Sequence, residues 1–318
     1  MDPGPPILVI KLGALGDFIQ ALGPFAAIRR HHADSHVTLL TAEPFRELAE
    51  ASPYFDRVMI DARPRAAQVG QWLGLRTLLR SGRFKMVYDL QTSDRSSMYY
   101  RLFWPGPRPE WSGIAKGCSH PHANPERDLM HTMERQAEQL KLAGIEETPP
   151  PDLSWAWDGD GADVSRFGLE PPYALVVPGG AAHRPAKRWP YRRYLEVVGR
   201  LAEAGIKPVL IGAGKEIEVL EAITGKCPQA ASLAGETSLL DIARLAHGAV
   251  GAIGNDTGPM HICAVAGCKS VVLFSASSDP KLCAQRGPGV VIIRKDKMDD
   301  ISVDQVWAEL GGDLAPPP

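Results

Sequence analysis

The chain has 318 residues, of which 44% are hydrophobic and 23% charged. Lys and Arg number 35 and Asp and Glu 37, which gives a formal net charge of −2. This balance excludes a nucleic-acid coat, an acidic disordered tail and a collagen-like fibre. No apolar run reaches the roughly 18 residues that a membrane span needs. At about 150 residues per domain, the length predicts two globular domains.

The first residues and the cysteines indicate a cytoplasmic protein. Residues 1–6 lack the basic segment of a secretion signal. The five cysteines are odd in number, sparse and without a CxxC pair, so we expect neither a disulfide framework nor structural zinc. The histidines lack HExxH spacing, and no GxSxG or GxxxxGK[ST] motif occurs.

Strands alternate with helices in the first half of the chain. The apolar run 7–10 is typical of a strand buried on both faces of a parallel sheet. The remaining predicted elements are helices at 18–30 and 44–51 and strands at 36–41, 58–60 and 86–90. This alternation predicts βαβ units in a doubly wound sheet, within a domain spanning residues 1–150.

The proline- and glycine-rich stretch 151–172 is predicted to connect the domains. A second α/β pattern follows over 173–318. It has strands at 173–177, 208–212, 248–253 and 270–274 and helices at 191–204, 216–223, 239–246, 257–266 and 301–310. We expect the last helix to pack either in its own domain or back on the first.

Three turns between a strand and a helix carry polar residues. In 11–17, Asp17 is either a helix cap or a general base at a ligand site, and both interpretations stay open. In 254–261, free N–H groups at the helix start could hold a diphosphate; the alternative is an ordinary turn between a strand and a helix, which does not account for His261. In 178–190, Lys187 could neutralise a leaving diphosphate, or the segment is a solvated basic loop with Trp189 as a lid.

Between residues 57 and 116, Lys and Arg number 11 against four acids. Such a stretch in a near-neutral protein could steer an anionic partner, although a solvated surface explains any single arginine. Aromatic residues are interspersed, and they either pack in a core or touch a membrane. They are Tyr99, Tyr100, Phe103, Trp104 and Trp111.

These segments together resemble the glycosyltransferase family 9 enzymes, the heptosyltransferases of lipopolysaccharide core assembly. The similar residues occur in the family's order over almost the whole chain. They are Lys11, Gly16, Asp17, Pro24 and Arg29; the run 88–91; His131, Arg135, Leu140 and Gly144; Pro178, Gly179, Lys187, Trp189 and Pro190; and the run 254–261.

The resemblance implies a GT-B architecture, in which two Rossmann-like domains face across a cleft. It implies that the first domain binds an acceptor and the second an ADP-sugar, typically ADP-L-glycero-D-manno-heptose. Transfer would invert the anomeric centre without a metal or other cofactor. The acceptor would be an anionic glycolipid or glycan of the lipopolysaccharide-core type, met at the cytoplasmic face of the inner membrane.

Carried over to this chain, the resemblance implies that Asp17 is the base and that Lys187 neutralises the departing diphosphate. Glu216 is similar to the acid that contacts the nucleotide ribose, with Glu218 as a rival. The other implied donor-site residues are Gly179, Gly180, Asp256, Thr257, Gly258, Pro259 and His261. The implied acceptor-site residues are Lys11, Gly16, Gln91 and Arg95.

Two departures concern the acceptor rather than the donor. Many relatives carry His or Thr shortly after the Gly-Asp pair, where this chain has Gln20 and Ala21, and residues 104–127 match no part of the family pattern. The alternatives are a sugar-nucleotide epimerase and a non-catalytic sugar-nucleotide sensor on the same fold. The absence of GxGxxG argues against a dinucleotide oxidoreductase.

Overall fold

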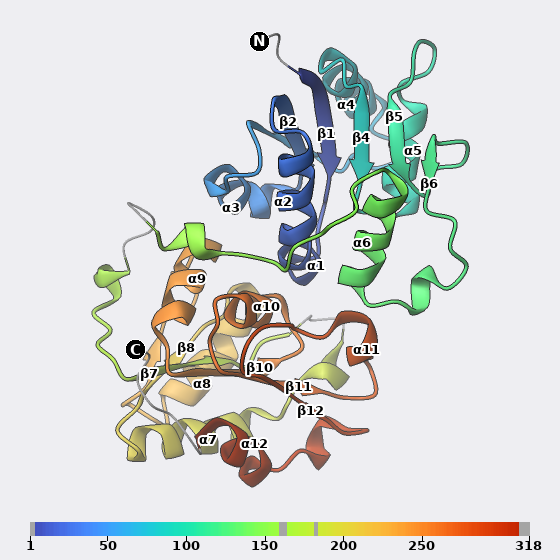
Figure 1. The fold of residues 1–318 in the computed structure, drawn as a ribbon. Coiled ribbons are helices and arrows are strands. Elements are labelled where there is room, and N and C mark those ends of the chain that lie inside the picture. The colour runs from blue at the N-terminus through green and yellow to red at the C-terminus, as the bar shows by residue number, and fades with distance from the viewer. Residues whose placement is uncertain (1–3, 159–163, 181–183, 312–318) are drawn as a thin grey trace. The chain divides into compact units, whose positions relative to one another are not determined.

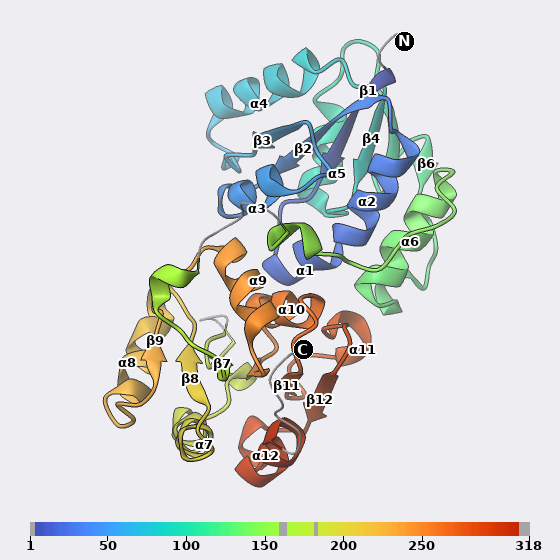
Figure 2. The same cartoon turned by 60° about the vertical axis from the view of Figure 1, so that its left-hand side comes forward.

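The computed structural model describes residues 4–158, 164–180 and 184–311 (Figure 1). It divides into two compact units, Met1–Pro151 and Asp152–Pro318. Each unit contains one six-stranded sheet with helices on both faces (Figures 1 and 2). The predicted α/β class with two doubly wound sheets is therefore confirmed.

The sheet of the first unit has the strand order β3-β2-β1-β4-β5-β6. Its strands, all paired in parallel, are β1 (Gly4–Ile10), β2 (Ser35–Thr41), β3 (Arg57–Ile60), β4 (Met86–Asp89), β5 (Glu110–Gly113) and β6 (His120–Pro121). The chain winds outward from β1 in one direction and then restarts at β4 in the other. Loops at the carboxyl ends of β1 and β4 therefore diverge, and open α/β sheets commonly bind ligands at such a switch point.

Helices cover both faces of this sheet because the side chains of a strand alternate in direction. Leu8 and Ile10 of β1 belong to one core cluster with apolar residues of α4 and α5. On the other face, α1, α2 and α6 contact one another. The helices are α1 (Leu15–Gln20), α2 (Leu22–His31), α3 (Arg46–Ala51), α4 (Val69–Ser81), α5 (Asp94–Arg101) and α6 (Thr132–Leu142), with short 3-10 turns at Glu43–Phe45 and Arg127–Leu129.

The single helix predicted over 18–30 is wrong, because the structure has two helices that meet at Ala21. Pro24 lies in the first turn of α2, where its missing N–H costs no hydrogen bond. In one continuous helix its ring would clash with the carbonyl of Gln20. The break therefore follows from the proline.

The second sheet has the order β12-β11-β10-β7-β8-β9, which repeats the topology of the first. Its strands are also paired in parallel. They are β7 (Tyr173–Val177), β8 (Lys207–Leu210), β9 (Ala231–Ser232), β10 (Gly251–Asn255), β11 (Ser270–Phe274) and β12 (Val290–Arg294). The switch point of this sheet lies between β7 and β10.

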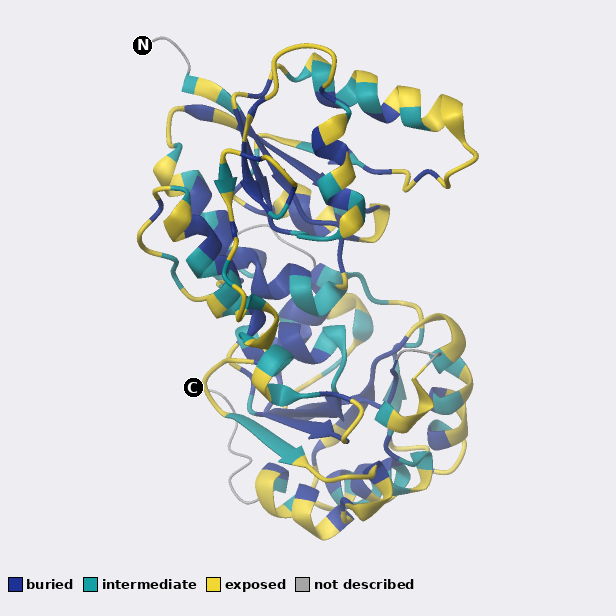
Figure 3. Cartoon of the chain, turned by 90° about the vertical axis from the view of Figure 1, so that its right-hand side faces the viewer, coloured by how far each residue is buried: buried dark blue, intermediate teal, exposed yellow. Residues whose placement is uncertain are grey.

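In the second unit, α7, α8 and α12 share one core cluster with the sheet, and α9 and α10 contact each other on the other face (Figure 1). Burial follows this layering, with buried strands and helices that are exposed on their outer sides (Figure 3). The helices are α7 (Tyr191–Glu203), α8 (Ile217–Thr224), α9 (Leu239–Gly248), α10 (Gly258–Val265), α11 (Pro280–Cys283) and α12 (Val303–Gly311), with 3-10 turns at Ser154–Ala156, Ser165–Phe167, Pro185–Lys187, Gly214–Glu216 and Met298–Asp300.

The last helix, α12, packs in the core of the second unit, where Val306 and Leu310 are fully buried. Part of the predicted connection at 151–172 contacts the second unit: Trp157 stacks on His247 of α9 at 4.3 Å, and Arg244 donates to the carbonyl of Ala156. Residues 159–163 of that connection lie outside the described residues.

Candidate active site

Two of the predicted polar turns meet at the switch point of the second sheet. Val177 at the end of β7 is in register with Gly254 near the end of β10, so the loops that follow both strands emerge side by side. The first loop begins at Pro178, and the second leads into α10. Residues 181–183 of the 178–190 segment lie outside the described residues.

Asn255 joins these two loops and the start of α7. Its fully buried amide donates to the carbonyls of Pro178 at 2.9 Å and Gly179 at 2.8 Å. Its Oδ1 accepts from the backbone N–H of Trp189 at 3.0 Å and from the hydroxyl of Tyr194 at 2.9 Å. The two hydrogen bonds that the amide donates and the two that Oδ1 accepts are all made within the protein. Asn255 therefore holds the loops in place and does not bind a ligand.

Lys187 and Asp256 form an ion pair of 2.7 Å between Nζ and Oδ2, and their side chains are only 12% and 8% exposed. Ser278 donates to the same carboxylate oxygen at 2.7 Å, and Gln285 donates to Oδ1 at 3.2 Å. Burial opposes ionisation of Asp256, but its hydrogen bonds with Lys187 and Ser278 and the lysine charge hold its pKa below the ordinary value. The pair therefore places a lysine cation at this edge of the sheet.

The glycine loop after β7 is held by Glu216, the predicted ribose acid. The backbone N–H of Gly180 donates to Glu216 Oε1 at 2.7 Å. A Cβ on Gly179 would lie 2.1 Å from the same oxygen, so only glycine lets the carboxylate approach the loop. Arg188 donates to the carbonyl of Gly180 at 2.8 Å from the other side of the loop. The structure thus brings together Gly179, Gly180 and Glu216.

Helix α10 begins at Gly258, directly after Asp256 and Thr257. Thr257 is the N-cap residue, but its hydroxyl makes no cap bond and is buried without a partner among the described residues. Pro259 lies in the first turn and His261 is buried inside the helix. Within the part of the chain that the structure describes, the first N–H groups of α10 therefore have no side-chain cap.

Lys11 and Gln91 lie at the switch point of the first sheet, just beyond β1 and β4. Lys11 Nζ donates to the carbonyl of Leu90 at 3.1 Å, and Gln91 Oε1 accepts from the backbone N–H of Leu12 at 2.8 Å. Burial lowers the pKa of Lys11, and the charge of Asp17 acts in the opposite direction. Both residues therefore tie the ends of the two strands together.

Asp17 lies in the first turn of α1 and is half-buried, with Gly16 before it. The N-cap residue is Ala14, so the interpretation of Asp17 as the cap is wrong. Burial lowers the pKa of Arg135 of α6, whereas the charge of Asp17 raises it. Asp17 therefore shares the electrostatic environment of the buried Lys11 and the half-buried Arg135.

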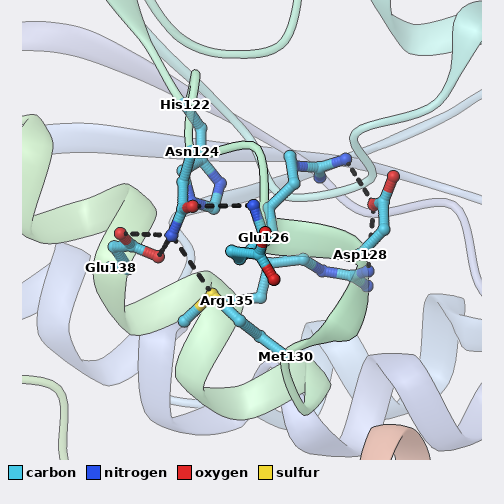
Figure 4. A network of polar contacts seen from close by, with 8 residues as sticks. His122, Asn124, Glu126, Asp128, Met130, Arg135 and Glu138 are labelled. Carbon is cyan, nitrogen blue, oxygen red and sulfur yellow. Dashed lines mark hydrogen bonds and ion pairs between the residues drawn. The ribbon is translucent and has the colours of Figure 1, made fainter.

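A polar network ties the loop before α6 to that helix (Figure 4). Asn124 donates to both oxygens of Glu138, at 2.8 and 2.9 Å, and the ring of His122 lies 3.3 Å from Glu138. Asp128 contacts Arg135 at 3.9 Å. The unmatched stretch 104–127 thus ends in a loop that helps to position Arg135. His131 is the N-cap residue of α6, and its side chain accepts from the N–H of Met133.

A cavity of about 760 Å³ opens beside the ends of β1, β2 and β3 in the first unit. Gln91 lines it, together with Gly13 and Arg63, which donates to the carbonyl of Leu12. Lys11, Gly16, Asp17 and Arg95 are not among its lining residues. Arg95 instead donates to the carbonyl of Pro64 at 3.3 Å.

The sequence interpretation missed Ser278 and Gln285, and it misplaced Trp189. Ser278 follows the buried strand β11 in a polar run, which is the signal that could have identified it, because β11 neighbours β10. Gln285 has no such signal. Trp189 is not a lid: it is 2% exposed, packs edge-to-face on Tyr194 and donates to the carbonyl of Ile301.

The family profile of glycosyltransferase family 9 (heptosyltransferase) matches residues 72–304, which is most of the chain. The chain belongs to glycosyltransferase family 9. The resemblance noted from the motifs is thereby confirmed, and the protein is a glycosyltransferase.

Named relatives agree with this membership. Lipopolysaccharide heptosyltransferase 2 of Escherichia coli K12 is 26% identical over 290 residues, covering 86% of this chain and 83% of that protein. The family 9 glycosyl transferase of Veillonella parvula has a TM-score of 0.82 at 20% identity, with 98% and 97% of the two chains covered. The E. coli heptosyltransferase WaaC, solved with ADP-2-deoxy-2-fluoro heptose, has a TM-score of 0.75 at 19% identity, with 95% and 98% covered. The fold is thus of the GT-B class.

No described helix is long and apolar enough to cross a membrane. Within residues 4–158, 164–180 and 184–311, no group of three His, Cys, Asp or Glu side chains is arranged to hold a metal ion.

Proposed function

We propose that this enzyme transfers heptose from ADP-heptose to a hydroxyl of a lipopolysaccharide-core-type acceptor, with inversion and without a metal. The observation that carries the proposal is the Lys187–Asp256 pair beside the uncapped start of α10. Family 9 relatives named as heptosyltransferases, one of them solved with an ADP-heptose analogue, support the donor.

On the donor side, the second unit supplies positive charge from protein groups. An ammonium group has three N–H donors, and Lys187 uses two of them, on Asp256 and Ser278. The third can bind an oxygen of the diphosphate, and the first N–H groups of α10 favour the same anion. As the bond between the anomeric carbon and the diphosphate oxygen breaks, these groups stabilise the charge of the departing ADP. We assign Glu216, which accepts from the N–H of Gly180 in the glycine loop, to a ribose hydroxyl of the donor.

On the acceptor side, we assign the base to Asp17 of the first unit. The attacking hydroxyl oxygen forms its bond to the anomeric carbon opposite the departing diphosphate, which inverts the centre. The hydroxyl proton passes to the Asp17 carboxylate as the bond forms. The 760 Å³ cavity lined by Gln91 and Arg63 is large enough for a sugar unit, and its position at the carboxyl ends of the strands fits an acceptor site.

A donor panel tests this function. Purified protein is titrated with ADP-heptose, ADP-glucose and UDP- and GDP-sugars, and transfer to truncated-core lipopolysaccharide is followed with and without EDTA. We expect ADP-heptose to bind best, EDTA to leave the rate unchanged, and NMR of the product to show inversion. Binding of a UDP-sugar alone would remove the heptosyl assignment, and epimerised donor in the absence of acceptor would indicate an epimerase.

Replacing Asp17 by Ala tests the base. We expect kcat to fall at least about 100-fold, the low end for general base catalysis, with donor affinity unchanged. Asp34→Ala, which removes an exposed carboxylate of the same unit, is the matched control and should keep the wild-type rate. Near-wild-type transfer by the Asp17→Ala variant would remove the assignment.

We also propose that the first unit touches the inner membrane surface at its cytoplasmic face, where a glycolipid acceptor would lie. Of the five aromatic residues within 99–111 only Trp104 is exposed, at 65%, and Val69 and Leu73 on α4 are 64% and 57% exposed. Arg76 and Arg80 hold the Trp104 loop against α4 through backbone carbonyls. Exposed apolar side chains beside cations suit an anionic lipid surface. Flotation with phosphatidylglycerol vesicles should be lost in a Trp104→Ser, Leu73→Ser variant; equal flotation would refute this contact.

A further inference from the structure

A second cavity in the first unit, of about 830 Å³, lies at the opposite edge of the sheet from Asp17. Pro5 near the start of β1, Lys85 just before β4 and Glu110 at the start of β5 line it. Because the strands are parallel, these three positions mark the amino-terminal edge. Along β1, the six residue-to-residue steps from Pro5 to Lys11 span about 20 Å at about 3.3 Å per step. A ligand here would therefore be remote from the proposed base.

The lining of this cavity is strongly cationic. Arg80, Arg83, Lys85 and Arg108 line it, and Glu110 is the one carboxylate among its lining residues. Arg83, Lys85 and Arg108 form no ion pair with any carboxylate in the part of the chain that the structure describes. The guanidinium of Arg108 lies over the ring of Tyr100, 4.9 Å from its centroid. No described carboxylate neutralises these three charges, and a concave surface lined by one sign of charge concentrates its field on an opposite charge.

The wall of the cavity is apolar and partly aromatic. Phe84, Met86 and Phe103 line it and are each less than 10% exposed. His32 contacts the hydroxyl of Tyr88 at 2.8 Å, and burial lowers the pKa of His32 to about 4, aided by the charges of His31 and Arg29. Both residues line the cavity, and the neutral imidazole and the phenol are polar groups without charge.

We propose that this cavity is a binding site for a phosphorylated compound that carries an apolar or aromatic portion. The phosphate is bound by Arg83, Lys85 and Arg108, whose N–H groups are free to form charge-assisted hydrogen bonds. The apolar portion packs against Phe84 and Phe103. The site is independent of the donor and acceptor chemistry proposed above, and its volume lies in the usual range for small-molecule sites.

Isothermal titration of the full chain with 2-naphthyl phosphate at low ionic strength tests the site. We expect the Arg83→Glu, Lys85→Glu double variant to bind at least about 10-fold more weakly than wild type. The matched control reverses two exposed cations outside the cavity, Arg57→Glu and Lys116→Glu, and should keep the wild-type affinity. Uncharged 2-naphthol should bind wild type at least about 10-fold more weakly than the phosphate.

Wild-type affinity in the double variant would overturn the proposal, because the anion would then be bound elsewhere, as at the donor site. Equal binding of 2-naphthol would also overturn it. If the double variant does not fold, Arg108→Glu on the other wall serves the same comparison. Binding of dihexanoyl phosphatidate and of ribose 5-phosphate, each measured on wild type and on the double variant, distinguishes a lipid headgroup from a soluble phosphate ester. Weaker binding of either in the variant supports the site, and unchanged binding of both contradicts it.

Discussion

Replacing Asn255 by Asp changes one atom group and reverses its hydrogen-bonding role. The amide Nδ2 that donates to the carbonyls of Pro178 and Gly179, at 2.9 and 2.8 Å, becomes an oxygen that faces two acceptors. The Oδ1 contacts with Trp189 and Tyr194 remain sterically allowed. The substitution therefore isolates the link between β10 and the glycine loop.

The expected cost follows from the burial of these groups. Each buried carbonyl left without a donor costs about 1–3 kcal/mol, so the two together cost about 2–6 kcal/mol. A carboxylate in a fully buried position adds a desolvation penalty unless it is protonated. The glycine loop loses its fixed position at the same time, so we expect ADP affinity to fall along with the free energy of unfolding.

Urea unfolding and calorimetric titration with ADP measure both effects. Tyr194→Phe is the graded control, because it removes one of the four hydrogen bonds and leaves Oδ1 paired with Trp189. It should cost about 1 kcal/mol and leave ADP affinity unchanged. If Asn255→Asp lies within 1 kcal/mol of wild type and binds ADP equally well, Asn255 does not hold the two loops.

Three further substitutions have defined outcomes. Lys187→Met should lower kcat about 100-fold or more through loss of the cation that faces the diphosphate. Lys207→Met, which replaces the exposed first residue of β8, should leave kcat unchanged. Burial raises the pKa of Asp89 from 3.8 to about 6. Between these two pH values the folded protein keeps a proton that the unfolded chain has lost, so wild type loses stability as the pH rises through this range. The unfolding free energy of Asp89→Asn relative to wild type should therefore grow by up to about 3 kcal/mol between pH 4 and 8, and an unchanged difference in urea titrations would contradict this. Gly179→Ala should displace the carboxylate of Glu216 and weaken ADP binding about tenfold in calorimetry. Thermal stability should change little, because the carboxylate can rotate away. A large loss of stability would show that the loop itself had been disrupted.

Local pattern identified much of this molecule. The apolar runs at 7–10 and 173–177 predict buried parallel strands, and the structure has β1 and β7 there. The motifs, taken in their order along the chain, identify the family. They consist of glycines, a proline and charged residues at the ends of strands, where backbone geometry and charge restrict the residue type locally. The helix break at Ala21 could also have been predicted, because Pro24 excludes a continuous helix.

The tertiary structure decided which side chains meet, because this depends on the order of the strands in the sheet and not on distance along the chain. Lys187 and Asp256 are 69 residues apart, and Ser278 joins them only because β11 lies beside β10. For the same reason Asn255 proved to be an internal link between loops and Trp189 a core residue. The cationic cavity likewise draws Arg83 and Arg108 from separate segments to one edge of the sheet, and that edge exists only once the strands are assembled.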